Sequence, residues 1–433
     1  MKCGASRALS GVRCIGLGYV LVFSIGVGAT AQTNAPLTWD QVRQRFEQNN
    51  PTLQASEFNI SESKAEEITA YLRPNPDFSL TADGTQIAPE KGVWEPLAGT
   101  FEVASISYLH ERDHKRELRL RSAQEGTAIA TSSQADLQRT LLFALRSAFV
   151  DTLQAKADLQ LAKDDLAYWD QVLSVSRSQY QAGAIASIDL DRLELQRVQF
   201  ESDVQTAEVN LRTAKIQLLA LLNERTPVDQ FDVIGPFGFS DQLPTLQEVQ
   251  QVALANRPDL RAAMQSVDQA RVNHQLAISD GSTDPTFSAW YTQNASTNNP
   301  SARQTLGLSV DIPLRIFDRN QGEKLRTQLD ITKNQRLLSA TQAQVFSDVD
   351  SAYAQVNSNL ILLRPYKAKY LQQATRVRDT IRFSYEHGGA SLLDFLNAES
   401  DYRSVRLSYL NLIGSYLTAA AQLNMAVGRE VIQ

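Results

Sequence analysis

The sequence is poor in the residues that interrupt helices and in those that cross-link chains. Its 433 residues include only 14 prolines, 20 glycines and two cysteines, Cys3 and Cys14. So few helix-breaking residues favour long helices over short alternating elements. Both cysteines lie in an N-terminal segment that has the pattern of a signal peptide, so we expect no disulfide in the mature chain.

Long apolar runs are missing after this N-terminal segment. Residues 1–31 contain a basic start, an apolar stretch and a small-x-small cleavage site at residues 29–31, which is typical of a secretory signal. Neither cysteine stands at the cleavage site, so no lipid anchor is expected. No later stretch has the roughly eighteen apolar residues of a membrane helix. If the mature chain crosses a membrane, it must therefore cross by strands.

Positive charge and catalytic motifs are also scarce. The formal charge is −6, and loss of the three basic residues of the signal makes it −6 − 3 = −9, which argues against a nucleic-acid partner. We find no phosphate-binding loop, nucleophile elbow or cysteine pair, so neither an enzyme nor a cofactor site is predicted. His110 and His114 have a spacing that suits a metal on a helix. A charged cluster where a strand becomes a helix is the favoured interpretation of that pair.

What the chain does contain is an internal duplication. Residues 178–194 and 383–399 align in one register, and a second match at a similar offset joins residues 50–53 to 257–260. Long polar helical segments flank each copy of the first motif, so each copy is expected to be the turn at the tip of a helical hairpin. The matched tip residues are Tyr180 and Tyr385, Gly183 and Gly388, Asp189 and Asp394, and Glu194 and Glu399.

Each half has the same predicted order: a short helix, two strands, a very long helix, a turn and a long helix. The mature chain divides into a first repeat at residues 32–225, an irregular linker at 226–243 and a second repeat at 244–433. Thr38 is the predicted N-cap of the first opening helix, and the second opening helix is predicted to start at residues 244–246.

Four segments alternate between apolar and polar residues and are predicted as strands: residues 77–85, 102–109, 286–293 and 305–312. Polar loops at about residues 86–100 and 294–303 join them in pairs. Such alternation is typical of a transmembrane barrel strand, and equally of a half-buried strand in a soluble protein. Small barrels need about eight strands. Either this sheet packs on helices or several chains share one barrel.

Two segments almost free of proline and glycine, residues 112–176 and 319–383, are each predicted as one helix. About 65 residues at 1.5 Å each make a helix on the order of 100 Å, too long for a compact core. Apolar residues spaced by three and four predict a coiled-coil seam in the second of them. The predicted seam consists of Phe346, Val349, Tyr353, Val356, Leu360 and Leu363.

The order of these elements resembles the outer-membrane efflux protein family typified by TolC. The motifs that carry the resemblance are the Asn-Pro-x-Leu opening at residues 50–53, the entry into the first strand at 75–80, the exit from the last at 311–322, and the twin tips. The exit motif is most like that of the channels serving resistance-nodulation-division pumps. The resemblance covers nearly the whole mature chain.

This resemblance implies a mainly α membrane protein of the outer membrane. Three chains would each give four strands to one twelve-stranded barrel, and the long helices would form a coiled-coil tunnel across the periplasm. The implied function is that of an exit duct in a tripartite efflux or secretion system. The implied partners are two further copies of the chain, a periplasmic adaptor, an inner-membrane pump and outer-membrane lipid.

The resemblance also assigns roles to the tips by position. The adaptor-docking residues are Gly183, Ala184, Gly388 and Gly389. The residues of the periplasmic gate are Tyr180, Asp189, Tyr385, Asp394 and Asn397. Two positions depart from TolC: Ala390 replaces an arginine of its closing network and Asn397 replaces an aspartate of its constriction. For the two aspartates, helix capping is an equally good interpretation.

Two other hypotheses remain from the sequence. The chain could be a periplasmic coiled-coil adaptor or scaffold without a pore, which explains the heptads but not the doubled strand pairs. It could also be a metal enzyme that uses His110 and His114.

Overall fold

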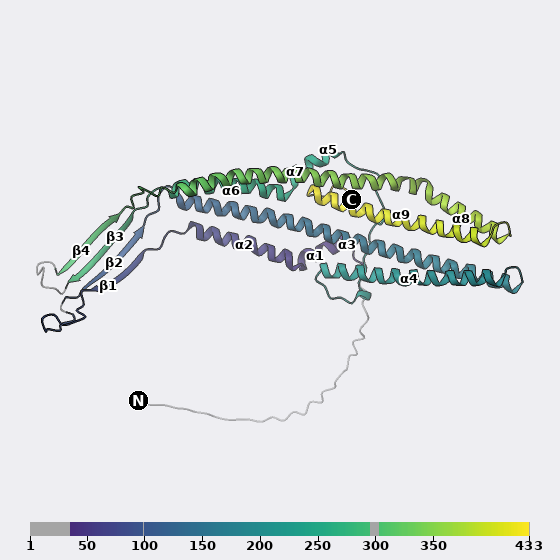
Figure 1. Cartoon of the computed structure of the whole chain (residues 1–433), viewed down its shortest axis with the longest axis horizontal. Helices are drawn as coiled ribbons and strands as arrows, with labels where there is room; N and C mark the ends of the chain where they lie inside the picture. Colours follow the sequence, from purple (N-terminus) through teal and green to yellow (C-terminus); the bar gives the residue numbers. More distant parts are fainter. Residues whose placement is uncertain (1–34, 98, 295–302, 433) are drawn as a thin grey trace, which may run out of the picture. The chain divides into compact units, whose positions relative to one another are not determined.

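The structure is a computed structural model that describes residues 35–97, 99–294 and 303–432. The predicted signal peptide, residues 1–31, lies outside the described residues, as does most of the predicted loop at 294–303. The chain from Pro36 onward forms one unit. Within that unit the strands lie at one end and the turns of the two helical hairpins at the other (Figure 1).

The first repeat follows the predicted order of elements. They are α1 (Trp39–Asn49), α2 (Pro51–Tyr71), β1 (Asp77–Asp83), β2 (Phe101–Leu109), α3 (Lys115–Gln181) and α4 (Ser187–Leu221). The long helix predicted at residues 112–176 is confirmed by α3, which has 67 residues. A short 3-10 helix, η1 (Val228–Gln230), lies in the linker.

The second repeat follows the same order with one interruption. Its elements are α5 (Leu246–Asn256), α6 (Pro258–Asp280), β3 (Thr286–Asn294), β4 (Gln304–Asp311), α7 (Gln321–Pro365), η2 (Tyr366–Tyr370), α8 (Leu371–Glu386) and α9 (Leu392–Val427). The prediction of one unbroken helix at residues 319–383 is wrong, because the π-helical turn η2 separates α7 from α8. Pro365 explains the break, since proline lacks an N–H and its ring clashes with the preceding turn.

Local sequence sets the start of the short helices. Thr38 is the N-cap of α1, as predicted. Thr245 is the N-cap of α5, and its backbone N–H donates to Glu248 at 2.9 Å. Proline occupies the first position of α2 and of α6, where its missing N–H costs nothing. The matched motifs at residues 50–53 and 257–260 are therefore equivalent helix starts.

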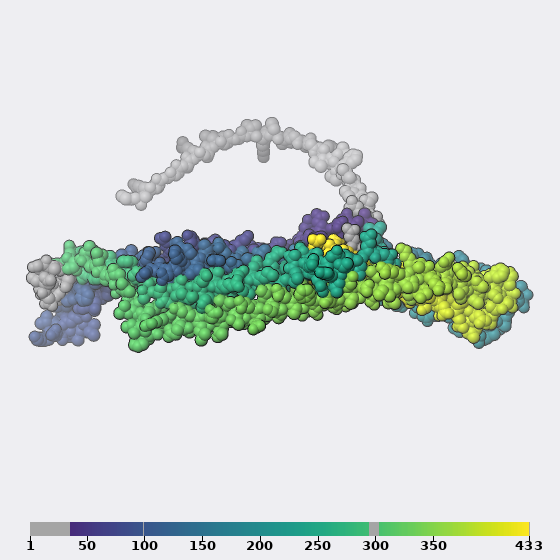
Figure 2. Space-filling model, turned by 90° about the horizontal axis from the view of Figure 1, so that it is seen from above, coloured from purple at the N-terminus to yellow at the C-terminus, as the bar shows by residue number. Residues whose placement is uncertain are grey.

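The long helices lie side by side. Near the strands α3 packs between α2 and α6, and toward the tips it packs between α4 and α9 (Figure 1). In Figure 2, α7 and α8 run along one face of the unit from near the strands to the tips. None of the helices in the described residues combines the length and the apolarity needed to cross a membrane.

The predicted coiled-coil seam of α7 is shifted by one residue at two positions. Val349, Val356, Leu360 and Leu363 are buried as predicted, but Phe346 is 39% exposed and Tyr353 is half-buried. Their neighbours Val345 and Ala352 occupy the core instead. The smaller side chains thus fill the core that α7 shares with α5, α6 and α9, and the aromatic rings pack at its edge or on the surface.

The four strands form one antiparallel sheet in the order β1-β2-β3-β4. One face, which we call the apolar face, carries mainly hydrophobic side chains in register across all four strands. They are Phe78, Leu80, Ala82, Ala104, Ile106, Tyr108, Phe287, Ala289, Tyr291, Leu306, Leu308 and Val310. Leu80, Leu306 and Leu308 are 74%, 76% and 76% exposed, so none of the residues that the structure describes covers this face.

The opposite face is rich in hydroxyl side chains, and we call it the polar face. It includes Ser79, Thr81, Ser105, Ser107, Ser288, Thr292, Thr305 and Ser309. Trp290 lies across Gly307 on this face, where a β-carbon would come within 2.2 Å of the indole ring. The strand prediction is thus confirmed, and of its two packing alternatives a sheet covered by the chain's own helices is wrong for the described residues.

Candidate functional site

Both tips make the same turn, as the duplication predicts. Gly183 and Gly388 have φ values of +74° and +75°, which glycine adopts without steric cost. Their N–H groups donate to the carbonyls of Tyr180 at 2.9 Å and Tyr385 at 3.1 Å. Glycine is therefore needed at each tip for backbone reasons alone. Space is not the reason, since a β-carbon at either position would meet no atom within 4 Å.

The residues beside these glycines differ in accessibility and in space. Ala184, Gly388 and Gly389 are exposed, like Gly183, so all four predicted docking residues lie on the surface of the chain. A β-carbon at Gly389 would lie 2.9 Å from the Ser384 hydroxyl, whereas Ala184 occupies the equivalent place in the first tip.

The two aspartates that follow the turns are not equivalent. Asp394 forms a capping box with Ser391, whose backbone N–H and hydroxyl lie 3.0 and 2.6 Å from its carboxylate. These hydrogen bonds lower the pKa of Asp394. In the first tip the N-cap is Ala186, which has no side chain to offer, and the described residues donate no hydrogen bond to the Asp189 carboxylate. Asp394 therefore does take part in helix capping, as the partner of the N-cap residue Ser391. Asp189 has no such capping role.

The two tyrosines also differ. Tyr385 stacks on Phe395 with ring centroids 5.0 Å apart and an interplanar angle of 7°. Burial raises the pKa of Tyr385, and the carboxylate of Asp189 adds to that rise. Tyr180, its counterpart, is 45% exposed. Asn397 is exposed on α9 and Ala390 is half-exposed beside the turn.

An aromatic cluster that the sequence did not reveal joins the two hairpins near these tips. Trp169 on α3 is 1% exposed and its indole N–H donates to the Leu193 carbonyl at 2.9 Å. Its ring centroid lies 5.1 Å from that of Phe200 on α4 and 6.0 Å from that of Phe395 on α9. Through Phe395 the stack continues to Tyr385. The heptad spacing of Leu166, Trp169 and Leu173 is the signal that could have indicated it.

A polar network lies next to this cluster, on the side away from the tips. Arg403 on α9 pairs with Asp203 on α4 and lies 3.8 Å from Asp165 on α3, while Arg406 lies 3.5 Å from Asp165. Burial raises the pKa of Asp165 despite these two arginines. Arg403 therefore connects three helices of the two hairpins.

A second contact of the network is made by Tyr168, whose hydroxyl donates to Glu399 at 2.8 Å. Glu399 is 9% exposed, and burial raises its pKa. Glu194, which aligns with Glu399 in the first tip, instead pairs with Arg177 at 2.8 Å on the surface. The second copy of the motif thus supplies an interior contact between hairpins that the first copy does not.

Asp158, two turns from Asp165 on α3, leads to a pH prediction. Burial raises its pKa to about 6, and its Oδ1 atom is buried with no hydrogen-bond partner. A folded-state pKa above the unfolded value means that the native state holds the extra proton, so this group stabilises the fold below about pH 4 and loses that contribution as pH rises through about 6.

Asp158→Asn should therefore raise the melting temperature at about pH 7.5, by the equivalent of about 1 kcal/mol, and change it little at about pH 4.5. The amide matches the shape of the protonated acid and carries no charge to desolvate. Asp164→Asn, at an exposed neighbouring position, is the control and should have no such pH-dependent effect. An equal shift for Asp158→Asn at both pH values would contradict the prediction.

The histidine pair does not form a metal site with its neighbours. His114 has an 87% exposed side chain and lies 4.0 Å from Glu117, and the His110 ring is edge-on to Phe287. In the ranges that the structure describes, no group of three or more His, Cys, Asp or Glu side chains is placed to hold a metal ion. Lys115, 4% exposed and 2.5 Å from Asp284, instead anchors the start of α3.

Comparisons with known proteins agree with this architecture. The family model "Outer membrane efflux protein" matches residues 249–429, most of the second repeat. The cobalt-zinc-cadmium resistance protein CzcC of Cupriavidus metallidurans is 22% identical over 405 residues, which cover 91% of this chain and 90% of that protein. Nodulation protein T of Rhizobium leguminosarum is 23% identical over 416 residues, covering 91% and 86%.

Solved structures share the fold. The channel CusC superposes with a TM-score of 0.75 at 16% identity, covering 90% of this chain and 92% of that one. The outer membrane protein VceC of Vibrio cholerae gives a TM-score of 0.72 at 14% identity, covering 90% and 96%.

The chain is built as an outer-membrane channel protein, with a long helical body and a small sheet. Its residues 249–429 match the outer membrane efflux protein family, which the resemblance in its sequence indicated. Its place is the outer membrane and its function is in efflux. The family consists of passive channels rather than enzymes.

Proposed function

We propose that three copies of this chain form the exit duct of a tripartite efflux system. Four strands from each copy would close one twelve-stranded barrel in the outer membrane, and the long helices would continue it as a tunnel into the periplasm. An inner-membrane pump would supply the energy, so the chain itself needs neither a catalytic site nor a cofactor.

The observation that carries this proposal is the contrast between the two faces of the sheet. The apolar face is uncovered by the described residues, and hydrocarbon lipid is the environment that suits it. The polar face suits a water-filled interior. The outer edges of β1 and β4 lack a partner strand among the described residues, and closure with neighbouring copies would satisfy their backbone groups.

A periplasmic adaptor would dock on the tips, at Gly183, Ala184, Gly388 and Gly389. Their exposure at the far end from the strands supports this placement (Figure 1). The exit motif at residues 311–322 favours a pump of the resistance-nodulation-division type. Similarity to a cobalt-zinc-cadmium resistance protein and to pyoverdine export proteins makes small solutes our choice of cargo.

The periplasmic gate would be formed by Tyr180, Asp189, Tyr385, Asp394 and Asn397. Of these, the exposed Tyr180 and Asn397 and the uncapped Asp189 have side chains available to a neighbouring copy. Asp394 and Tyr385 are engaged within the chain and would act by holding the turn and the hairpins in place. The domain division proposed is the two repeats, residues 32–225 and 244–433, with the linker between them.

Disulfide cross-linking across the proposed barrel seam tests the trimer. The chain has no cysteine after Cys14, so engineered pairs are unambiguous. Ser79→Cys or Thr81→Cys on β1, each combined with Thr305→Cys or Ser309→Cys on β4, places both thiols on the polar face. In outer membranes, one register of these pairs should give covalent dimers and trimers on oxidation, because neighbouring strands lie about 4.8 Å apart.

The matched control is Leu80→Cys with Ser309→Cys, in which the two thiols lie on opposite faces of the sheet. It should remain monomeric in denaturing gels. Absence of cross-linked trimer in every polar-face pair, together with recovery of the protein as a soluble periplasmic monomer, would overturn the proposal and favour a scaffold without a pore.

A further inference from the structure

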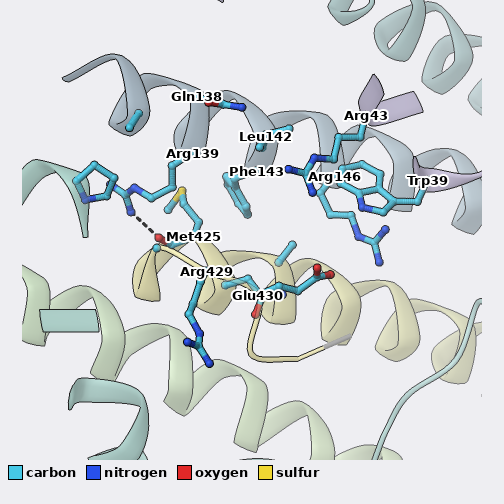
Figure 3. A pocket seen from close by; sticks show the side chains of 15 residues that line it. Trp39, Arg43, Gln138, Arg139, Leu142, Phe143, Arg146, Met425, Arg429 and Glu430 are labelled. Atoms are coloured by element: carbon cyan, nitrogen blue, oxygen red, sulfur yellow. Dashed lines mark hydrogen bonds between the residues drawn. The ribbon is translucent and has the colours of Figure 1, made fainter. Parts of the chain in front are cut away.

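A cavity lies where the two repeats meet, far from the tips and the strands. It has a volume of about 350 Å³, which is within the range of small-molecule sites. Its walls come from α1, α3, the end of α9 and the segment that follows α9 (Figure 3). Trp39, Leu142, Phe143 and Met425 give it apolar surface.

The charged lining of this cavity is mostly positive. Arg43, Arg139, Arg146 and Arg429 line it, against one carboxylate, that of Glu430. Two of these arginines are already held: Arg139 pairs with Asp136 at 2.6 Å and donates to the Met425 carbonyl, as Figure 3 shows, and Arg43 pairs with Glu47 at 3.0 Å.

Arg146 has no such partner. Its guanidinium lies 4.5 Å from the ring centroid of Trp39 and 5.8 Å from that of Phe149. No carboxylate of the described residues lies within the 4.0 Å of an ion pair. Burial lowers the pKa of Arg146, which reports a cation held away from water. A partly buried guanidinium that no carboxylate contacts directly, with Glu430 and Asp40 acting on it only from a distance, is the feature that a bound anion would satisfy.

The second repeat provides an internal comparison. By the alignment of the repeats, Arg43 corresponds to Gln250 and Arg146 to Asp350. In the second repeat, the Gln250 amide on α5 donates to the Asp350 carboxylate on α7 at 2.6 Å, and this hydrogen bond joins the two helices. The first repeat has two arginines in these places, which cannot form such a hydrogen bond with each other. Packing of the opening helix against the long helix therefore does not require arginines at these two positions. Their presence in the first repeat calls for another reason.

We propose that this cavity binds a small organic anion, a carboxylate carried on a flat apolar body. The carboxylate would be received by Arg146 and Arg43, and the apolar body would lie against Trp39, Phe143 and Met425. The aromatic ring beneath Arg146 keeps the guanidinium in place for bidentate contact with the two oxygens. Asp40 and Glu430 are the acidic groups whose charge acts on Arg146. Their repulsion would disfavour ligands that carry more than one negative charge.

Calorimetric titration of the purified full-length protein with 2-naphthoate tests this site, with 2-naphthamide as the neutral probe of the same shape. The wild type should bind the carboxylate and not the amide. Arg146→Gln should weaken binding of 2-naphthoate by about tenfold or more, since a hydrogen bond to a charged group is lost. Arg326→Gln, at an exposed position on α7, is the matched control and should bind like the wild type.

Trp39→Leu is the second variant, because it installs the residue that the second repeat has at the same place, Leu246. It should fold and should also lose affinity for 2-naphthoate. It decides the test if Arg146→Gln does not fold. Equal affinity for the acid and the amide, unchanged binding in both variants, or no binding to the wild type would each overturn the proposal. None of these results depends on the channel being a trimer.

Discussion

Trp169→Ala should cost about 3–5 kcal/mol of stability and should loosen the two hairpins from each other. Trp169 is 1% exposed, so its removal leaves a cavity that rigid helices fill only in part. The substitution also removes the hydrogen bond to the Leu193 carbonyl and the stacking contacts with Phe200 and Phe395. These contacts join α3, α4 and α9, so the damage should concentrate at the tip half of the molecule.

Melting temperature and hydrogen exchange of purified protein measure this effect. We expect a lower melting temperature and faster exchange in residues 160–200 and 385–405, with the sheet unchanged. Trp169→Phe should cost less, because it keeps an aromatic ring and loses the N–H. Trp94→Ala is the control, since Trp94 is 52% exposed and should be neutral. Unchanged exchange at the tips in Trp169→Ala would falsify the role given to the cluster.

Arg403→Gln should cost about 2 kcal/mol and should open the proposed channel more often. Arg403 pairs with Asp203, lies 3.8 Å from Asp165, and covers the Phe200 ring at 5.0 Å. The Asp203 side chain is 24% exposed and would lose its partner, and the Asp165 side chain is 13% exposed and would keep only Arg406 at 3.5 Å, in a place where water screens charges poorly. Their repulsion would act between α3 and α4, next to the contact with α9.

Single-channel recording in planar bilayers gives the functional measurement, and melting temperature gives the stability. Arg403→Gln should raise the open probability, while Arg271→Gln, which removes an exposed pair with Asp268, should leave both quantities unchanged. In a double-mutant cycle, adding Asp203→Asn should recover part of the loss, because it removes one of the stranded charges. No change in stability for Arg403→Gln would contradict the interpretation of the network.

Much of the fold follows from local patterns in the sequence. Two-residue alternation located all four strands, because each strand has a mainly apolar face and a mainly polar face, although Val103 on β2 and Trp290 on β3 lie on the polar face. The tip turns were found because a turn with a positive φ favours glycine, and the duplicated motif has a glycine at the same place in both copies. The Thr38 cap was found because capping depends on residues adjacent in sequence.

The contacts between distant segments were less predictable. Val345 and Phe346 are adjacent and both apolar, as are Ala352 and Tyr353, so heptad spacing alone could not decide which member of each pair is buried in the core. Heptad spacing could have indicated that Trp169 is buried, but no local pattern reveals that its partners are Phe200 on α4 and Phe395 on α9. The π-helical turn has a local cause in Pro365. A proline within a helix predicts that the helix is disturbed, but it does not predict whether the result is a kink, a break or a π-helical turn.

Differences between the two tips were hidden by their likeness in sequence. Ser391 and Ala186 occupy the same place in the two turns, and this one difference decides whether the aspartate three residues later is engaged in a capping box. Similarly, Tyr385 finds Phe395 on its own hairpin, whereas the position of Tyr180 is exposed. The similar sequences of the two tips thus give the same backbone turn, but their side chains make different contacts.

The exposure of helix α8 has a consequence for how newly exported chains assemble. It follows the π-helical turn, none of its residues is fully buried, and Val377 and Phe383 are 53% and 62% exposed. A helix with so little interior of its own gains stability mainly from whatever packs on its outer side, which in the proposed trimer is another copy. Newly exported chains would therefore carry an unfinished α8 until they assemble, and periplasmic proteases would remove those that fail to find partners.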